Sequence, residues 1–145
     1  GRIRSNDTAI SLHYNNNDDQ VYRLYKAAFD REPDQGGLGF WIYNADQGMS
    51  LIEMSARFID SDEFRSLYGE SPSNGEFITN LYVNILDREP DQAGYDWWVD
   101  QLTNNPDKTW EKVLVDFSES DENMAATGES IEHGFEYTPF DQWIL

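Results

Sequence analysis

The sequence predicts an all-α fold: two tandem repeats of three to four helices, packed as one helical bundle with a pseudo-twofold relation. A twelve-residue motif occurs twice, as DREPDQGGLGFW at 30–41 and as DREPDQAGYDWW at 87–98. The residues ahead of both copies align without a gap, and their apolar positions are spaced as in a helix. A long motif in two matching contexts indicates one helical unit used twice.

The first helix of each repeat leads into the motif. Its apolar stripe consists of Val21, Leu24, Tyr25, Ala28 and Phe29 in the first repeat, and of Ile78, Leu81, Tyr82, Ile85 and Leu86 in the second. Pro33 and Pro90 stop these helices, because proline lacks the amide hydrogen that a helix interior needs. Asp34 and Asp91 then precede the next apolar pattern, where each can cap the N-terminus of a second helix.

The third and fourth helices follow at a spacing that changes from 57 to 59 residues, because the second repeat contains a two-residue insertion. Ser50, with a glutamate three residues on, fits a capping box. Thr109 stands at the equivalent position, but Lys112 replaces the glutamate. Ser61 and Ser120 each precede Asp-Glu and are expected to cap a short fourth helix.

The expected core takes large side chains from both repeats: Leu24, Tyr25, Phe29, Trp41, Phe58, Leu81, Leu86, Trp98 and Phe117. The expected organisation is a polar approach segment at 1–20, one helical domain at 21–137 with repeats at 21–68 and 77–127 and a linker at 69–76, and a C-terminal tail at 138–145. The stretch from 129 mixes Gly134, Pro139 and aromatic residues, so it is expected to lie irregularly over the bundle.

The charge of the chain limits the classes of partner that it is expected to bind. Asp and Glu number 28 against ten Lys and Arg, a net charge of −18. This field repels phosphate groups, so nucleic acid is not an expected partner. Membrane insertion is not expected either, because the sequence has no run of about 18 apolar residues. The chain has no cysteine, which rules out a disulfide framework and a thiolate metal site.

The two motifs, together with the Phe58–Glu63 and Phe117–Glu122 segments, resemble a bacterial family known as domain of unknown function 4214. The resemblance covers about residues 19–137, as two tandem copies. The helix–DREPD–helix arrangement is also similar to the phycobilisome linker domain, an α-helical assembly module. The family resemblance implies an accessory domain of a large secreted, RTX-type calcium-binding, S-layer-like or surface-associated protein, and it implies no agreed biochemical role.

In each motif, carboxylates occupy alternate positions of the turn between the first and second helices. This pattern raises the hypothesis of a calcium site. The candidate metal ligands are Asp30, Glu32, Asp34, Asp87, Glu89 and Asp91. An EF-hand is rejected, because glutamine occupies the loop position that needs glycine and tryptophan the position that needs a bidentate glutamate. The alternative is structural: two of the aspartates cap helices, and Arg31 and Arg88 either pair with a neighbouring carboxylate or cap the C-terminus of the preceding helix. Calcium at another kind of site stays open.

Aromatic side chains outside the core are the candidate ligand-binding residues, because an apolar face with polar edges suits a sugar ring or a peptide groove. They are Trp97, Trp110, Tyr43 and Trp143. Packing against the core is the alternative for each of them.

No catalytic residue is expected. His13 and His133 lie outside the repeats, and neither HExxH nor GxSxG occurs. The predicted function is a non-catalytic interaction module that binds a protein or a surface glycan, within a larger secreted or cell-surface bacterial protein of RTX or S-layer type. One alternative is a calcium-stabilised structural spacer or cap without a separate ligand. The other is a small-substrate enzyme.

The C-terminal residues from Phe140 to Leu145 admit two interpretations. An acid followed by apolar residues resembles the uncleaved signal of proteins exported by type I secretion. Alternatively, Phe140, Trp143 and Ile144 have helical spacing and fasten the tail to the bundle.

Overall fold

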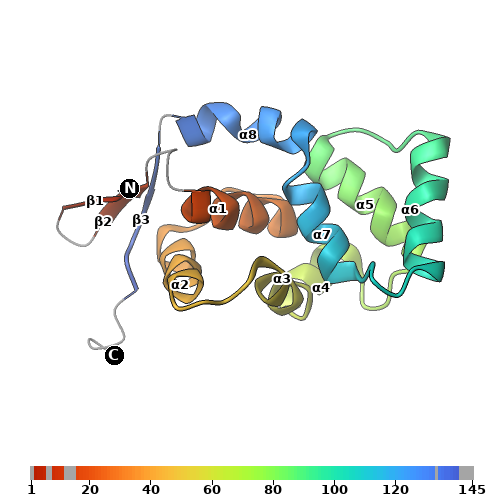
Figure 1. The fold of residues 1–145 in the computed structure, drawn as a ribbon, viewed down its shortest axis with the longest axis horizontal. Coiled ribbons are helices and arrows are strands. Elements are labelled where there is room, and N and C mark those ends of the chain that lie inside the picture. The colour runs from red at the N-terminus through yellow and green to blue at the C-terminus, as the bar shows by residue number, and fades with distance from the viewer. Residues whose placement is uncertain (1, 6–7, 12–15, 133, 141–145) are drawn as a thin grey trace.

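The computed structural model describes residues 2–5, 8–11, 16–132 and 134–140. Within these ranges the chain forms eight helices and a small antiparallel sheet (Figure 1). The helices are α1 (Asn16–Phe29), α2 (Gln35–Asp46), α3 (Leu51–Ile59), α4 (Asp62–Tyr68), α5 (Asn74–Leu86), α6 (Gln92–Asn104), α7 (Trp110–Ser118) and α8 (Asp121–Glu132), and the strands are β1 (Arg2–Ser5), β2 (Thr8–Ser11) and β3 (Phe135–Tyr137). The predicted all-α class is confirmed, and the small sheet adds a feature that the sequence did not predict.

The two shared motifs form helix-turn-helix corners between α1 and α2 and between α5 and α6. Asp30 and Asp87 end the first helices in the left-handed region, with φ of 50° and 55°. Asp34 and Asp91 each accept a hydrogen bond from the amide three residues on, and so cap the second helices. The predicted corners and caps are therefore confirmed, whereas the twofold relation between the repeats stays a prediction.

An arginine ties each corner to the fourth helix of its repeat. Arg31 donates to the two carboxylate oxygens of Glu63 at 2.7 and 3.0 Å, and Arg88 donates to both oxygens of Glu122 at 3.0 Å. A planar guanidinium matches a carboxylate through two parallel hydrogen bonds. The predicted pairing of these arginines with a neighbouring carboxylate is confirmed.

The two repeats share one core, and α1 runs through its middle (Figure 1). Ala27 and Ala28 are buried along with the predicted stripe, so α1 is apolar on most of its circumference, as expected of a core helix. α3 packs against α7, where the hydroxyl of Ser55 donates to the carbonyl of Glu111 at 2.9 Å. These contacts join the first repeat to the second.

The core prediction is confirmed for most of its members but not for all. Leu24, Tyr25, Phe29, Phe58, Leu81 and Phe117 are buried. Trp41, Leu86 and Trp98 pack against the core but are only partly buried. The two tryptophans lie on α2 and α6, and none of the residues of α6, all of which are described, is fully buried. An outer helix covers one side of its aromatic residues and leaves the other side to solvent.

The two ends of the chain meet in the sheet, which has the order β1-β2-β3 with Ile3 opposite Ile10. β3 lies beside α2, and the amide of Thr138 donates to the carbonyl of Gln35 at 2.9 Å. A Cβ atom at Gly39 would lie 1.6 Å from the carbonyl oxygen of Thr138. The close approach of this segment to α2 therefore requires a glycine.

Three boundaries differ from those expected. α1 begins at Asn16, within the expected approach segment 1–20, because the acidic residues of its first turn favour a helix N-terminus. α5 begins at Asn74, inside the expected linker, because Ser73 and Glu76 form a capping box. α8 continues to Glu132 and is followed by β3, where an irregular segment was expected.

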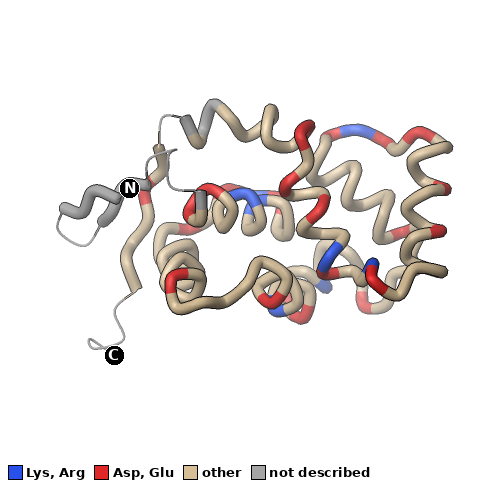
Figure 2. Tube along the Cα trace, viewed as in Figure 1, with Lys and Arg blue, Asp and Glu red and all other residues tan. Residues whose placement is uncertain are grey.

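The charges are spread over the helices rather than gathered in one region. Figure 2 shows acidic residues on most of the helices and a small number of Lys and Arg. None of the described helices is long and apolar enough to cross a membrane.

Candidate functional site

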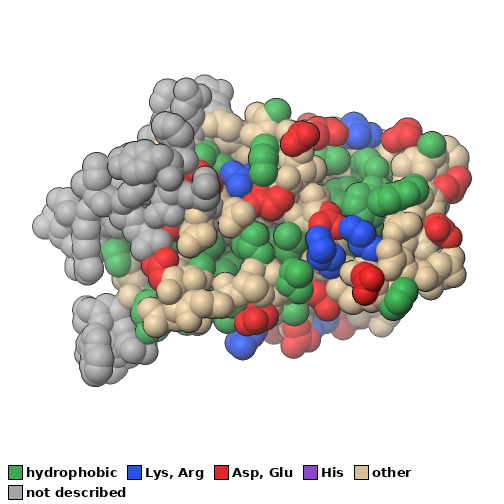
Figure 3. Space-filling model, in the orientation of Figure 1, with side chains coloured by type: hydrophobic (Ala, Val, Ile, Leu, Met, Phe, Trp, Pro, Cys, Tyr) green, Lys and Arg blue, Asp and Glu red, His purple; other side chains and the backbone are tan. Residues whose placement is uncertain are grey.

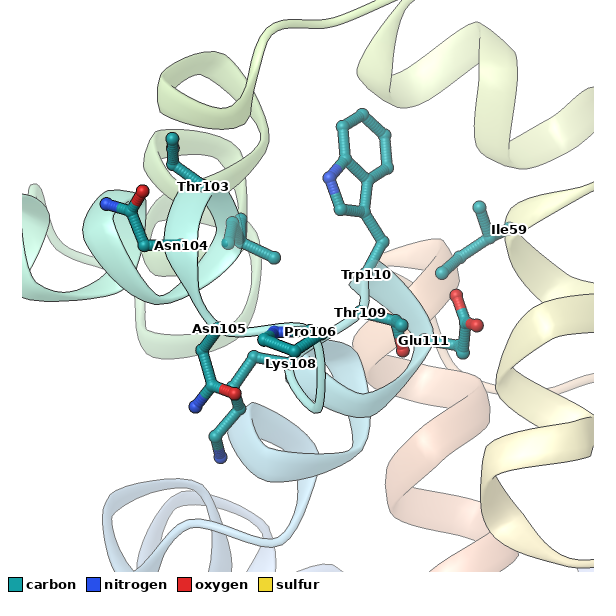
Figure 4. A pocket seen from close by; sticks show the side chains of 10 residues that line it. Ile59, Thr103, Asn104, Asn105, Pro106, Lys108, Thr109, Trp110 and Glu111 are labelled. Carbon is teal, nitrogen blue, oxygen red and sulfur yellow. The ribbon is translucent and has the colours of Figure 1, made fainter.

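A pocket of about 680 Å³ lies between the end of α6, the loop that follows it and the start of α7 (Figure 4). Thr103 and Asn104 stand on one side of it, and Trp110 and Ile59 on the other. The full lining is Ile59, Leu102, Thr103, Asn104, Asn105, Pro106, Lys108, Thr109, Trp110 and Glu111. The pocket therefore combines an indole and aliphatic side chains with amides and hydroxyls.

Trp110 is held in place by two contacts. Its ring stacks on Phe77, with ring centroids 4.3 Å apart and planes 5° from parallel. Its indole nitrogen donates to the side-chain oxygen of Asn74 at 2.9 Å. Since both partners belong to α5, the indole is fixed against the core before any ligand arrives.

The loop that borders the pocket is also ordered by its own hydrogen bonds. Asn105 donates to the side chain of Gln101 at 2.9 Å and accepts from the amide of Asp107 at 3.0 Å. Lys108 donates to Asp116 at 2.7 Å, which ties the loop to α7. Thr109 caps α7 through the amide of Lys112, as predicted.

The residues that line the pocket are mostly uncharged. Glu111 is the single acid among its described lining residues, which include no histidine. The ammonium group of Lys108 is engaged by Asp116. Thr103 donates to the carbonyl of Val99 at 2.8 Å and Asn104 donates to Asp100 at 2.6 Å, so the groups left for a ligand are the side-chain oxygens of both residues and the second amide hydrogen of Asn104. Such groups beside an indole fit a neutral, polar ligand.

The four predicted ligand-binding aromatics are not brought together. Trp110 lines the pocket. Trp97 projects from α6 with 51% exposure, edge-on to Trp98. Tyr43 lies on α2 beside Phe140, with ring centroids 5.0 Å apart. Trp143 lies outside the described residues, as does the rest of the tail from 141 to 145. Phe140 therefore contacts the bundle as the fastening hypothesis expects.

In the first corner, two of the predicted metal-binding carboxylates already have partners. Asp34 accepts from the hydroxyl of Tyr25 at 2.7 Å and from the amide of Gly37, and these bonds hold its pKa below the usual range. Glu32 accepts from the hydroxyl of Tyr22 and pairs with Lys26 at 3.1 Å. Both carboxylates therefore have structural roles.

The remaining candidate ligands are spread over the two corners. Asp91 caps α6, Glu89 is exposed on the second corner, and Asp87 ends α5. Burial raises the pKa of Asp30, and the negative charge of Asp87 in the second repeat raises it further. Among residues 2–5, 8–11, 16–132 and 134–140, no group of three or more His, Asp or Glu is arranged to hold a metal ion.

Sequence reasoning missed the amides of the pocket, Asn104 and Asn105, and the loop residues Pro106 and Lys108. A signal for them was present: the spacing of the repeats lengthens by two residues between the second and third helices. The structure places one extra residue at the end of α6 and one in the loop after it, by comparison with α2 and its loop. The insertion thus forms part of the pocket wall.

The family model described as "Domain of unknown function (DUF4214)" matches residues 55–127, from within α3 to within α8. No curated protein and no solved structure matches the chain. The matched region contains the second corner with its arginine, the inserted loop and all ten residues that line the pocket. Because it takes in slightly more than half of the 145 residues, the chain belongs to the DUF4214 family.

Proposed function

We propose that this chain is a non-catalytic interaction module that binds a protein or a surface glycan, with the pocket at the α6–α7 loop as its binding site. The observation that carries the proposal is the combination of a fixed indole, Trp110, with the amide and hydroxyl groups around it. A rigid aromatic wall with polar groups at its edge binds sugars and peptides with little loss of conformational entropy.

The ligand class follows from charge. A net charge of −18 opposes polyanions, so nucleic acids and acidic glycans are disfavoured. The pocket lining has no unpaired basic group to offset that field, since Lys108 is engaged by Asp116. A neutral glycan, or a neutral to basic protein segment, is the ligand that suits both the pocket and the charge.

The proposed context is a larger secreted or cell-surface bacterial protein of RTX or S-layer type. The support is the resemblance that placed the chain in its family, together with its acidity and its lack of cysteine. Export by a type I system belongs to the same proposal, and its test is whether export of the parent protein requires residues 141–145.

A glycan array and an affinity pull-down, each with and without calcium, test the binding proposal. Asn104→Ala removes one amide from the pocket wall, and it is expected to weaken a ligand selected in these screens about tenfold. Asn44→Ala, on the equivalent part of α2, is the matched control and should leave affinity unchanged. The proposal is contradicted if the chain retains no protein and no glycan in these screens, or if the two variants bind with equal affinity.

A calcium-stabilised spacer is the second candidate, favoured by the negative charge of Asp87 acting on the carboxylate of Asp30. A cation near both carboxylates would offset their repulsion. Melting in calcium chloride, compared with sodium chloride at equal ionic strength, separates this function from simple screening. A larger rise in calcium supports the spacer, and equal rises remove it.

A further inference from the structure

The two corners differ in the packing of aromatic rings behind the shared motif. In the first corner Phe29 is 7% exposed, and its ring centroid lies 5.0 Å from those of both Tyr25 and Phe58. Trp41 contacts Phe58 at a centroid distance of 4.8 Å. Four aromatic rings therefore fill the space between α1, α2 and α3.

The second corner keeps three of these four rings. Tyr82 and Trp98 contact Phe117 at centroid distances of 5.1 and 4.9 Å. Leu86 stands where the first repeat has Phe29. A pocket of about 170 Å³ opens among these four side chains, so it lies where the second repeat lacks a ring.

This ring pocket, lined by Tyr82, Leu86, Trp98, Phe117 and a polar rim, reaches the surface. The rim consists of Arg88, Asp116, Ser120 and Glu122. The side chains of Arg88 and Glu122 are 43% and 48% exposed. Figure 3 shows hydrophobic side chains at the surface between α5, α6 and α7, where this pocket lies. A ligand can therefore enter from solvent.

The polar groups of the rim already have partners. Arg88 and Glu122 bond to each other, and Asp116 accepts from Lys108 at 2.7 Å. The hydroxyl of Ser120 donates to a backbone carbonyl of α7 at 2.7 Å. A ligand rich in hydroxyls would gain few hydrogen bonds here, whereas an apolar group would leave no rim group unpaired.

We infer that the ring pocket binds one aromatic ring, supplied by a phenylalanine side chain of a partner protein. Its volume is close to the about 150 Å³ of an apolar cavity that takes up benzene. Its aromatic lining and Arg88 are the counterparts of the groups around Phe29, so the first corner is an example of the same pocket with a phenyl ring in place. The pocket shares no described lining residue with the site proposed above, so the inference goes beyond it.

Titration of the whole chain with N-acetyl-L-phenylalaninamide, followed by NMR, tests the inference. Saturable binding of one equivalent is expected, with a shift of the indole signal of Trp98, and N-acetyl-L-alaninamide should not bind. Leu86→Phe places the missing ring in the pocket and should weaken binding about tenfold or more. Leu67→Phe, at a residue 41% exposed on α4, is the matched control and should bind as the unchanged chain does.

The reverse substitution keeps the test decisive if Leu86→Phe does not fold, which circular dichroism would reveal. Phe29→Leu opens the same space in the first corner and should add a second equivalent of binding, with a shift at Trp41. No saturable binding by the unchanged chain, unchanged affinity of a folded Leu86→Phe variant, or a single equivalent bound by Phe29→Leu would each overturn the inference.

Discussion

α2 and α6 begin in the same way but lie in different surroundings. α2 buries Leu38, Gly39 and Ile42 and lies beside β3. None of the described residues of α6 is fully buried. Where α2 has Gly39, α6 has Asp96, whose carboxylate accepts from Gln92 of its own helix. The residues that start a helix are therefore separate from those that allow another segment to pack on it. Both repeats have the helix cap, but only α2 has the glycine that lets the segment after β3 pack against it.

The same contrast holds at the ring cluster. The first repeat closes it with Phe29, and the second leaves it open at Leu86. The inserted loop beside Trp110 is also a feature of the second repeat. The first repeat therefore supplies the more closely packed part of the core, and both candidate binding pockets lie mainly in the second.

The largest expected effect comes from truncating the central ring of each cluster. Phe58 contacts three aromatic rings, and its counterpart Phe117 contacts two. Phe58→Ala should cost about 4 kcal/mol of unfolding free energy and Phe117→Ala about 3 kcal/mol, because the second cluster is already open. Urea titration measures both values. A greater loss for Phe117→Ala would reverse the comparison.

The next effect concerns the contact between α2 and the segment after β3. Gly39→Ala places a methyl group on the carbonyl of Thr138 and should cost about 2 kcal/mol, because the segment after β3 must move away. Gly36→Ala is the control in the same helix, where the nearest atom lies 4.0 Å from the added carbon. Its cost should be nil, or it should stabilise by up to about 1 kcal/mol through helix propensity. Equal melting temperatures of the two variants would show that the packing of this segment on α2 contributes nothing to stability.

The smallest effect is electrostatic and depends on pH. The folded pKa of Asp30 is raised above the ordinary value of 3.8 by burial and by Asp87. The protonated form is thus favoured by folding, and its contribution is present below the unfolded pKa and lost as pH rises through the folded pKa. Asp30→Asn should therefore stabilise at pH 7 by less than about 1 kcal/mol, since the group is exposed and screened.

The control for this prediction is the same variant at a pH below the ordinary pKa of an aspartate. Asparagine also suits the left-handed backbone at position 30, but that contribution does not depend on pH. The part of the gain that comes from charge should vanish in acid. An equal gain at both pH values would assign the whole effect to the backbone.

The sequence predicted the parts of the fold that depend on neighbours along the chain. The caps by Asp34, Asp91 and Ser61 need residues three positions away, and the apolar stripes of α1 and α5 need one helix each. The packing of the segment after β3 on α2 could not be predicted in this way, because Gly39 and Thr138 lie far apart in the sequence. Its glycine was visible, but a glycine in a helix has many explanations.

The candidate site could be predicted in part for the same reason. Trp110 was a candidate because its residue type suits a ligand, whereas the amides around it have no local motif. The exchange of Phe29 for Leu86 was visible in the aligned repeats. That this exchange leaves a pocket could not be predicted, because the pocket also depends on the positions of Trp98 and Phe117 on other helices.

If the second corner is the first corner with one ring missing, reciprocal substitutions at Phe29 and Leu86 reveal it most directly. The measurement is the unfolding free energy of Phe29→Leu and of Leu86→Phe by urea titration. Phe29→Leu should lose about 1 kcal/mol by opening a cavity, and Leu86→Phe should gain about 0.5 to 1 kcal/mol by filling one. A loss of 1 kcal/mol or more in both variants would mean that the second corner has no room for the ring, and would contradict the claim.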